Sequence, residues 1–256
     1  MRAKLRILAV AAGLLAAGGL APAARAAGEA EVPDAHFSFE GLFGTFDRAS
    51  AQRGLQVYLQ VCANCHSMKQ LYYRNLAELG LPESEVRAIA ASVQVTDGPN
   101  DQGEMFQRPG RPSDRFKSPF PNEQAARAAN NGALPPDLSV ITKAREGGAN
   151  YIHALLTGYT DPPPDFQLME GMHYNKYFPG HQIAMPPPLQ DGLVEWKDGT
   201  KATVDQMARD VSTFLAWAAE PEMETRKALG VRMILFLGVM GGLVYAVKRK
   251  IWADLH

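Results

Sequence analysis

The apolar positions of the chain gather into two long runs, one near each end, with shorter helical patterns between them. The first run, Ile7–Ala24, consists mainly of Ala, Leu, Val and Gly and follows three basic residues. It closes at Ala24–Ala26, where small residues flank Arg25, as at the cleavage sites of secreted proteins. We therefore predict a cleavable export signal over residues 1–26, with an uncleaved membrane anchor as the alternative. The mature chain would then lie in an oxidising compartment outside the cytoplasmic membrane.

The second run, Leu229–Val247, is mostly apolar over 19 residues, close to the roughly 20 that a helix needs to cross a bilayer core. Arg232 lies near one end, where its long side chain can reach the interface. Lys248–Lys250 and Trp252 follow at once. Because basic residues collect on the cytoplasmic side of membrane helices, the run predicts an anchor whose C-terminal end is cytoplasmic. A buried core helix is the alternative, but such helices rarely run so long and end at three basic residues.

Between the two runs, the pattern predicts short helices joined by long loops. Helices are expected at Ser50–Val61, Ser84–Val93, Glu123–Ala129, Ala149–Leu156 and residues 203–219. Residues 96–122, dense in Gly, Pro, Asp and Arg, are predicted as loop, and Leu193–Thr200 as a small β-hairpin. The fold class is mainly α, with long loop insertions and one C-terminal transmembrane helix. The predicted order is an export signal at 1–26, an exported domain at 27–227, an anchor at 228–248 and a tail at 249–256.

The charge of the chain becomes informative only when its segments are counted separately. The 256 residues include 26 basic and 27 acidic side chains and are 46% hydrophobic, with a mean hydropathy of −0.19. These values exclude a disordered chain, a collagen-like fibre and a polytopic membrane protein. Residues 27–227 alone hold 18 basic and 26 acidic side chains, a net charge of −8. Such a domain repels nucleic acid and attracts basic proteins, so we expect no nucleic-acid partner.

The two cysteines of the chain, Cys62 and Cys65, form the motif CANCH with His66. Two thiols one helical turn apart can add to the two vinyl groups of a haem, and the adjacent histidine then reaches the iron as proximal ligand. A zinc site would need four ligands, and a thioredoxin-like pair would need a βαβ context. A disulfide between residues so close would constrain almost no chain. We therefore predict one haem c attached covalently through both cysteines, at the end of the predicted helix Ser50–Val61.

The sixth position of such an iron is filled by Met, by His or by water. Met68 is too close to His66 to reach the opposite face of the haem, and Met207 lies in a helical pattern that favours core packing. Met185 precedes three prolines in HQIAMPPPLQD, which stiffen a loop without supplying backbone donors. The residues therefore favour Met185. The alternatives are His181, His173, Met172 and a Pro-rich surface loop without a ligand.

Four further blocks, together with CANCH and the anchor, resemble the cytochrome c1 family, the haem subunit of the cytochrome bc1 complex. They are ARAANNGALPPDLS (Ala126–Ser139), KAREGGANYIHALLTGY (Lys143–Tyr159), YFPGHQIAMPPPL (Tyr177–Leu189) and DVSTFLAWAAEPEMETRKALG (Asp210–Gly230). The blocks occur in the same order as in the family, and the resemblance covers nearly all of residues 36–252. It is therefore far more specific than CANCH alone, which indicates only a c-type cytochrome.

The resemblance implies a role for each matching residue. Met185 would be the distal ligand, and Arg145 and Tyr151 would lie near the haem propionates. The run Asn130–Leu138, with Asn130 and Pro135, would line one side of the haem pocket. From the residues alone, Arg145 is equally a solvated surface charge and Tyr151 a packing residue. Some bacterial relatives carry a further cysteine pair that clips the loop before the distal methionine, and this chain has no counterpart of it.

The resemblance further implies a one-electron carrier in a dimeric complex with cytochrome b and a Rieske iron–sulfur subunit. The haem would accept electrons from the Rieske subunit and pass them to a soluble basic cytochrome c. The domain would be periplasmic, on the bacterial inner membrane. The alternatives are a membrane-anchored monohaem cytochrome serving another reductase or oxidase, and a peroxidase or gas sensor with an open sixth site. Candidate docking acids are Glu83, Glu85, Asp97, Asp101 and Glu104.

Overall fold

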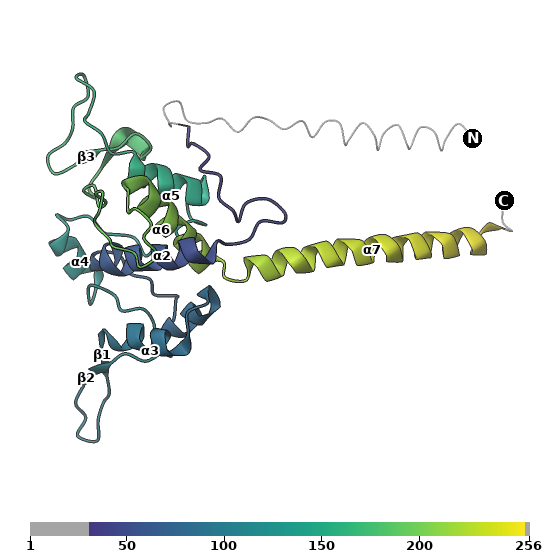
Figure 1. Ribbon diagram of the computed structural model, residues 1–256, viewed down its shortest axis with the longest axis horizontal. Helices are drawn as coiled ribbons and strands as arrows, with labels where there is room; N and C mark the ends of the chain where they lie inside the picture. The colour runs from purple at the N-terminus through teal and green to yellow at the C-terminus, as the bar shows by residue number, and fades with distance from the viewer. Residues whose placement is uncertain (1–30, 254–256) are drawn as a thin grey trace.

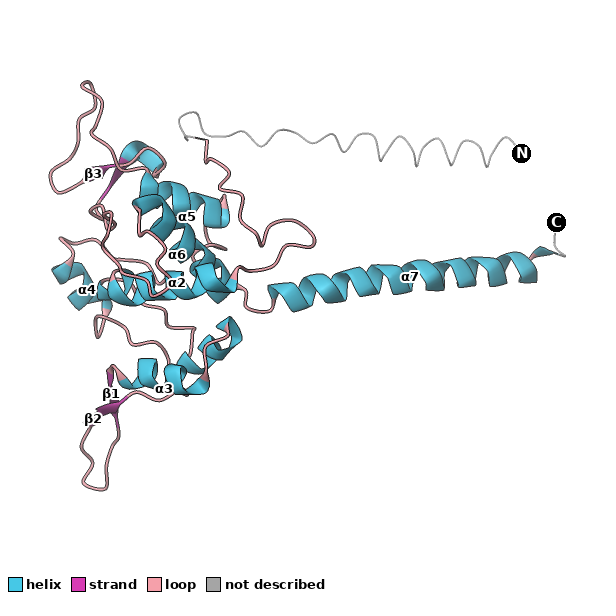
Figure 2. Cartoon of the chain, viewed as in Figure 1, coloured by secondary structure: helices cyan, strands magenta, loops and turns pink. Residues whose placement is uncertain are grey.

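The computed structural model describes residues 31–253. The predicted export signal at 1–26 and the last residues of the predicted tail lie outside these described residues. The described chain is mainly helical, with a domain of short helices and long loops from which one long helix emerges (Figures 1 and 2). The predicted mainly α fold class with a single C-terminal apolar helix is therefore confirmed.

Two helices, α2 (Arg48–Gln60) and α6 (Val204–Ala219), pack against each other at the centre of the domain (Figure 1). The Asp47 side chain caps the start of α2 by accepting a hydrogen bond from the Ser50 amide at 3.1 Å. Gly54 lies at the contact, since a Cβ atom there would meet the Asp210 carbonyl oxygen at 2.0 Å. Only a glycine therefore lets the two helices approach this closely.

The core is built from aromatic side chains around this pair of helices. The rings of Tyr58 and Phe214 lie 5.8 Å apart, and Phe214 stacks on Trp217 at 5.9 Å. Phe116 extends this cluster away from α6 and stacks on Tyr73 at 4.5 Å. Met207 is fully buried in the same core, as its helical pattern predicted. The α5 helix (Gly148–Thr157) covers another face of α6 (Figure 1).

The predicted loop at 96–122 is wrong in its first part, where two strands pair. The strands β1 (Gln94–Asp97) and β2 (Phe106–Pro109) form an antiparallel hairpin next to α3 (Glu83–Ala91). Arg108 holds it together by pairing with Asp97 and, at 2.7 Å, with Asp114. The strands are short and largely polar, so their stability comes from these side-chain ties, which no alternation of apolar residues could have indicated.

The predicted hairpin at Leu193–Thr200 is also wrong, because the structure forms turns there and no strand. Trp196 is buried, and the Arg53 guanidinium lies 5.7 Å from its ring centre. The chain does turn here, since the Gly199 amide donates to the Trp196 carbonyl at 3.1 Å, but packing of Trp196 replaces strand pairing. The remaining elements are η1 (Cys62–Asn64), η2 (Tyr73–Leu79), α4 (Glu123–Ala129), β3 (His173–Tyr174), η3 (Pro179–His181) and β4 (Gln182–Ile183), with β3 and β4 antiparallel.

The last helix, α7 (Met223–Ile251), has 29 residues and leaves the domain as a single rod (Figure 2). Its length of about 43 Å at 1.5 Å per residue exceeds a hydrocarbon core of roughly 30 Å. Within the described residues, it is the one helix long and apolar enough to cross a membrane, and its apolar stretch is fully exposed. The helix begins five residues before the predicted anchor at 228–248, because its first turns belong to the domain.

The connection between α6 and α7 is short and held by ion pairs. Glu220 follows α6 directly and pairs with Lys143 at 2.6 Å and with Arg226 of α7 at 2.5 Å. Burial raises the pKa of the Glu220 carboxyl, but hydrogen bonds from both cations outweigh burial and lower it overall. The junction therefore keeps its charge at neutral pH and ties α7 to the domain.

Asp210 is the fully buried acid at the contact of α2 and α6. Its carboxylate accepts hydrogen bonds from Arg53 Nε at 2.7 Å and Arg53 Nη2 at 3.0 Å. Ser50 Oγ and Gln206 Nε2 donate to Oδ1 at 2.6 and 3.0 Å. The hydrogen bonds from Arg53 to Asp210 raise the pKa of the guanidinium further above its usual range, so Arg53 stays charged.

We predict that Arg53→Met destabilises the domain by about 3–5 kcal/mol, because it leaves the buried Asp210 carboxylate without its counter-ion. Chemical denaturation of the full chain measures this change. The control is Arg87→Met, which removes the exposed pair with Glu83 and should cost less than about 1 kcal/mol. Equal losses for the two variants would contradict a special role for the buried pair.

Candidate haem-binding site

The CANCH motif lies where α2 ends, as the sequence predicted. Cys62 begins the short turn η1, and its carbonyl oxygen accepts hydrogen bonds from the amides of Cys65 at 3.1 Å and His66 at 2.8 Å. This tight turn holds the three residues together. Both cysteines are free thiols in this structure. Burial raises the pKa of the Cys62 thiol to about 12, so it is protonated at neutral pH.

His66 is oriented by the backbone of a distant segment. Its Nδ1 lies 2.8 Å from the carbonyl oxygen of Pro136. Because a carbonyl only accepts, Nδ1 must carry the hydrogen, and Nε2 keeps its lone pair for a metal. Burial lowers the pKa of His66, against the opposing effects of Pro136 and Asp137. The imidazole is therefore neutral, which is the state that a metal ligand needs.

Asp137 fastens the segment that carries Pro136 to the residues that follow the motif. Its Oδ2 accepts hydrogen bonds from Ser67 Oγ and from the Lys69 amide, both at 2.8 Å. Its Oδ1 accepts from the Ser139 amide at 2.9 Å. Burial raises the pKa of Asp137, but these hydrogen bonds outweigh burial and lower the pKa overall. Asp137 belongs to the run predicted to line the pocket, but its hydrogen bonds to Ser67 and Lys69 were not predicted, because no motif spacing indicates them.

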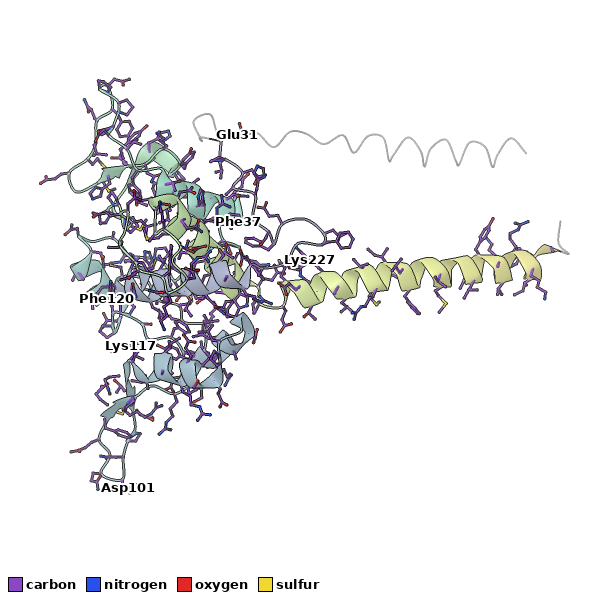
Figure 3. All side chains as sticks on the ribbon, viewed as in Figure 1. Glu31, Phe37, Asp101, Lys117, Phe120 and Lys227 are labelled. Carbon is purple, nitrogen blue, oxygen red and sulfur yellow. The ribbon has the colours of Figure 1, made fainter. Side chains whose placement is uncertain are left out.

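A cavity of about 720 Å³ opens beside the motif. Cys65 and the predicted pocket residue Pro135 both line it, together with Phe116, Lys117 and Phe120. Lys117 and Phe120 lie at the side of the domain away from α7 (Figure 3). Cavities of this volume hold cofactor-sized molecules. The residues present therefore fit a haem by three observations: two free thiols in one turn, a neutral imidazole with Nε2 available, and an adjoining cavity.

Asn130 reaches this site only through the helix that it ends. Its Nδ2 donates to the Ala126 carbonyl at 2.7 Å, at the C-terminal end of α4, and Ala126 lines the cavity. Asn130 itself is half-buried and is not among the lining residues. Of the run Asn130–Leu138, residues 134–137 line the cavity, and the role of the run beside a haem stays a prediction.

Met185 lies in a separate part of the domain, after β4. Its carbonyl oxygen accepts a hydrogen bond from the Tyr159 hydroxyl at 3.0 Å, and burial raises the pKa of that hydroxyl above its usual range. Tyr159 and Pro187 line a second cavity of about 580 Å³. Tyr159 was missed as a positioning residue in the sequence analysis. No contact described for residues 31–253 joins Met185 to His66, so its role as ligand stays a prediction.

The alternatives to Met185 lie in the same region. His173 lines the second cavity, and the His181 ring stacks on Tyr174 at 5.8 Å. Met172 is half-buried, in the turn just before β3. The chemistry of the loop still favours Met185, because its backbone is the one held by both Tyr159 and the prolines.

The structure does not bring Arg145 and Tyr151 to either cavity. Arg145 is exposed, and its Nη1 donates to the carbonyl of its neighbour Ala144 at 2.9 Å. Tyr151 is buried in the first turns of α5, where its amide donates to the Gly147 carbonyl at 3.2 Å. Their predicted place near haem propionates therefore stays a prediction that rests on the resemblance.

The domain of short α helices around a CANCH turn, with one C-terminal apolar helix, has the fold class of a membrane-anchored c-type cytochrome. Comparison with known proteins specifies the family. Residues 37–255 match the family model described as the Cytochrome C1 family. The chain therefore belongs to the cytochrome c1 family, and the resemblance seen in the sequence is confirmed.

Relatives from bacteria and plants match most of the chain. Cytochrome c1 of Rhodospirillum rubrum is 46% identical over 98% of this chain and 97% of its own length. Cytochrome c1-2, heme protein, mitochondrial, of Solanum tuberosum is 55% identical over 89% of this chain and 87% of its own length. Cytochrome b/c1 of Bradyrhizobium diazoefficiens is 50% identical over 99% of this chain, which spans 40% of that longer protein.

We predict that Asp137→Asn lowers the stability of the domain by about 1–3 kcal/mol at neutral pH, through loss of the charged hydrogen-bond acceptor. The folded-state pKa of Asp137 lies below the unfolded value of about 3.9. Its contribution is therefore complete above that pH and is lost as the pH falls through the folded-state pKa. Denaturation curves recorded between neutral and acid pH should show the difference from wild type shrinking below about pH 4. The exposed Asp101→Asn is the control, and a difference that does not depend on pH would contradict the tie.

Proposed function

We propose that this chain carries single electrons as the haem subunit of a cytochrome bc1 complex. Membership of the cytochrome c1 family supports the class, and the name of one relative, cytochrome b/c1, supports the complex. The observation that carries the proposal is the CANCH turn beside a cavity, with His66 Nδ1 tied to Pro136. That arrangement leaves a neutral imidazole nitrogen for iron.

One haem c would be held by thioether bonds from Cys62 and Cys65, with His66 and Met185 as axial ligands. When bound, the haem supplies the Fe(II)/Fe(III) couple. The chain then acts by holding its ligands still. Pro136 fixes the His66 ring, and Tyr159 with the prolines after Met185 restrains the other loop. With His66 and Met185 both held to the iron, no position would remain for a substrate, and the chain would perform no bond-making chemistry.

The partners follow from the same proposal. A Rieske iron–sulfur subunit would be the donor and a soluble basic cytochrome c the acceptor, in a dimeric complex that contains cytochrome b. The net charge of −8 on residues 27–227 supports a basic acceptor. With Lys248–Lys250 on the cytoplasmic side, α7 would place the domain in the periplasm, after removal of the export signal at 1–26.

The candidate docking acids differ in whether their carboxylates form ion pairs within the domain. Asp97 is paired with Arg108, which holds the pKa of its carboxyl below the usual range, and Glu83 is paired with Arg87. Asp101 and Glu104 are exposed in the loop between β1 and β2, and Asp101 lies at the far tip of the domain (Figure 3). Glu85 is likewise exposed, in the first turn of α3. Glu85, Asp101 and Glu104 are therefore the better candidates for steering a basic partner.

We predict that Met185→Leu removes the weak near-infrared charge-transfer band of the oxidised protein and lowers its reduction potential. Each tenfold loss of preference for Fe(II) over Fe(III) corresponds to about 59 mV for one electron. Redox titration with absorption spectra measures both changes. Met169→Leu, at an exposed methionine of the same region, should leave them unaltered. An unchanged potential and spectrum in Met185→Leu would overturn the ligand assignment.

The proposed partners are tested by isolation and kinetics. The chain extracted in mild detergent should co-purify with cytochrome b and Rieske subunits. Its oxidation by a basic cytochrome c, followed by stopped flow, should slow as salt rises to 0.1 M, where the Debye length is about 10 Å. Asp101→Asn with Glu104→Gln should slow it several-fold at low salt, whereas Glu31→Gln with Glu222→Gln should not. Isolation without those subunits, or a rate insensitive to salt, would contradict the assignment of partners.

A further inference from the structure

The loop between Phe37 and Phe46 carries two exposed apolar side chains at its tip. Leu42 is 60% exposed and Phe43 is 79% exposed, whereas Phe37 and Phe46 are buried at 6%. We call these two residues the Leu42–Phe43 tip. Placing adjacent large apolar side chains in water is unfavourable, and such exposed apolar groups mark contact sites. In this structure the side chains of the tip do not enter the core of the domain.

Two hydrogen bonds between Ser38 and Thr45 close the loop below this tip. The Thr45 amide donates to the Ser38 carbonyl at 3.1 Å, and Ser38 Oγ donates to the Thr45 carbonyl at 2.9 Å. Gly44 is required by the close turn, since a Cβ atom there would lie 2.0 Å from the Glu40 carbonyl oxygen. The loop that exposes the tip is therefore held in one conformation by its own hydrogen bonds and its tight turn.

Aromatic packing fixes the base of the loop to the domain. The Phe39 ring lies 5.0 Å from that of Phe37 and 5.0 Å from that of Phe46. Asn150 of α5 donates from Nδ2 to the Glu40 carboxylate at 2.7 Å. The apolar residues of the loop thus divide into three that pack inward and two that point away from the core.

The same loop is fastened to the first turns of α7. Lys227 Nζ donates to the carbonyl oxygens of Phe39 at 2.6 Å and Gly44 at 3.2 Å. Glu224 accepts from the Phe46 amide at 2.7 Å and pairs with Arg48 at 2.9 Å. Lys227 lies two residues before the apolar run of α7 begins. The loop and the start of the membrane helix are therefore one connected unit.

The direction of the loop agrees with these contacts. It projects beside the beginning of α7, toward the side on which α7 leaves the domain, and the labelled Lys227 lies at this junction (Figures 1 and 3). The tip is thus presented at the level where the membrane-spanning run starts. The basic residues Arg48 and Lys227 lie at its base, where anionic headgroups would be expected.

We propose that the Leu42–Phe43 tip inserts into the interfacial layer of the lipid bilayer, as a second membrane contact beside α7. This rests on the proposed membrane anchoring of α7. An apolar pair with cations at its base suits acyl chains below headgroups, and continuity with α7 favours lipid over a soluble protein partner. The tip and α7 together orient the domain, because two separate contacts with a plane prevent tilting that a single helix allows.

The test is electron paramagnetic resonance of the full-length holoprotein in nanodiscs of phosphatidylcholine and phosphatidylglycerol. Phe43→Cys carries a nitroxide, and its collisions with oxygen, which concentrates in lipid, are compared with those with a water-soluble nickel chelate. Leu235→Cys in the exposed part of α7 reports membrane insertion of the anchor. Met105→Cys, exposed near β2, is the aqueous control. Wild-type protein treated with the label should take up none if Cys62 and Cys65 hold haem.

We expect the oxygen-to-nickel ratio at Phe43→Cys to be several-fold above that at Met105→Cys and to approach that at Leu235→Cys. A ratio equal to that at Met105→Cys, with Leu235→Cys in lipid, would overturn the inference and leave the anchor intact. Low collision rates with both reagents would also overturn it, since they indicate cover by protein. A water-exposed Leu235→Cys would instead contradict the proposed anchor.

Discussion

The contact between α2 and α6 is the constraint on which the rest of the structure depends. Gly54 lets the two helices touch, and the ion pair between Arg53 of α2 and Asp210 of α6 links them. One end of this pair of helices leads into the CANCH turn at Cys62, and the other into the junction with α7. The position of the candidate haem site relative to the membrane helix is therefore set by one helix crossing with a buried charge pair.

The site itself is assembled from segments far apart in the chain. The motif supplies the thiols and the imidazole, but Pro136 and Asp137 determine how His66 is oriented. The loop of Met185 depends in turn on Tyr159. Residues outside the predicted ligand set thus orient the side chains and loops that belong to it. Such positioning groups are as much a part of a metal site as its ligands.

The sequence predicted the helices well because their apolar spacing and caps are local features. The motif CANCH and the apolar run Leu229–Val247 within α7 were likewise recognisable, because haem attachment and membrane crossing each require a fixed sequence pattern. The β1–β2 hairpin was missed because Arg108 stabilises it from within the hairpin while its strands lack apolar alternation. The hairpin expected at Leu193–Thr200 failed because Trp196 enters the core. The roles of Asp137 and Tyr159 depend on tertiary contacts, which no spacing in the chain records.

The junction at Glu220 has a consequence for how partners can approach. Only three residues separate α6 from α7, and Glu220 clamps them between Lys143 and Arg226. The short junction therefore couples the orientation of the domain, and with it that of the CANCH turn, to the direction of α7. Under the proposed function, this junction would hold the candidate site in one orientation to α7, and a partner would have to bring its own redox centre to it.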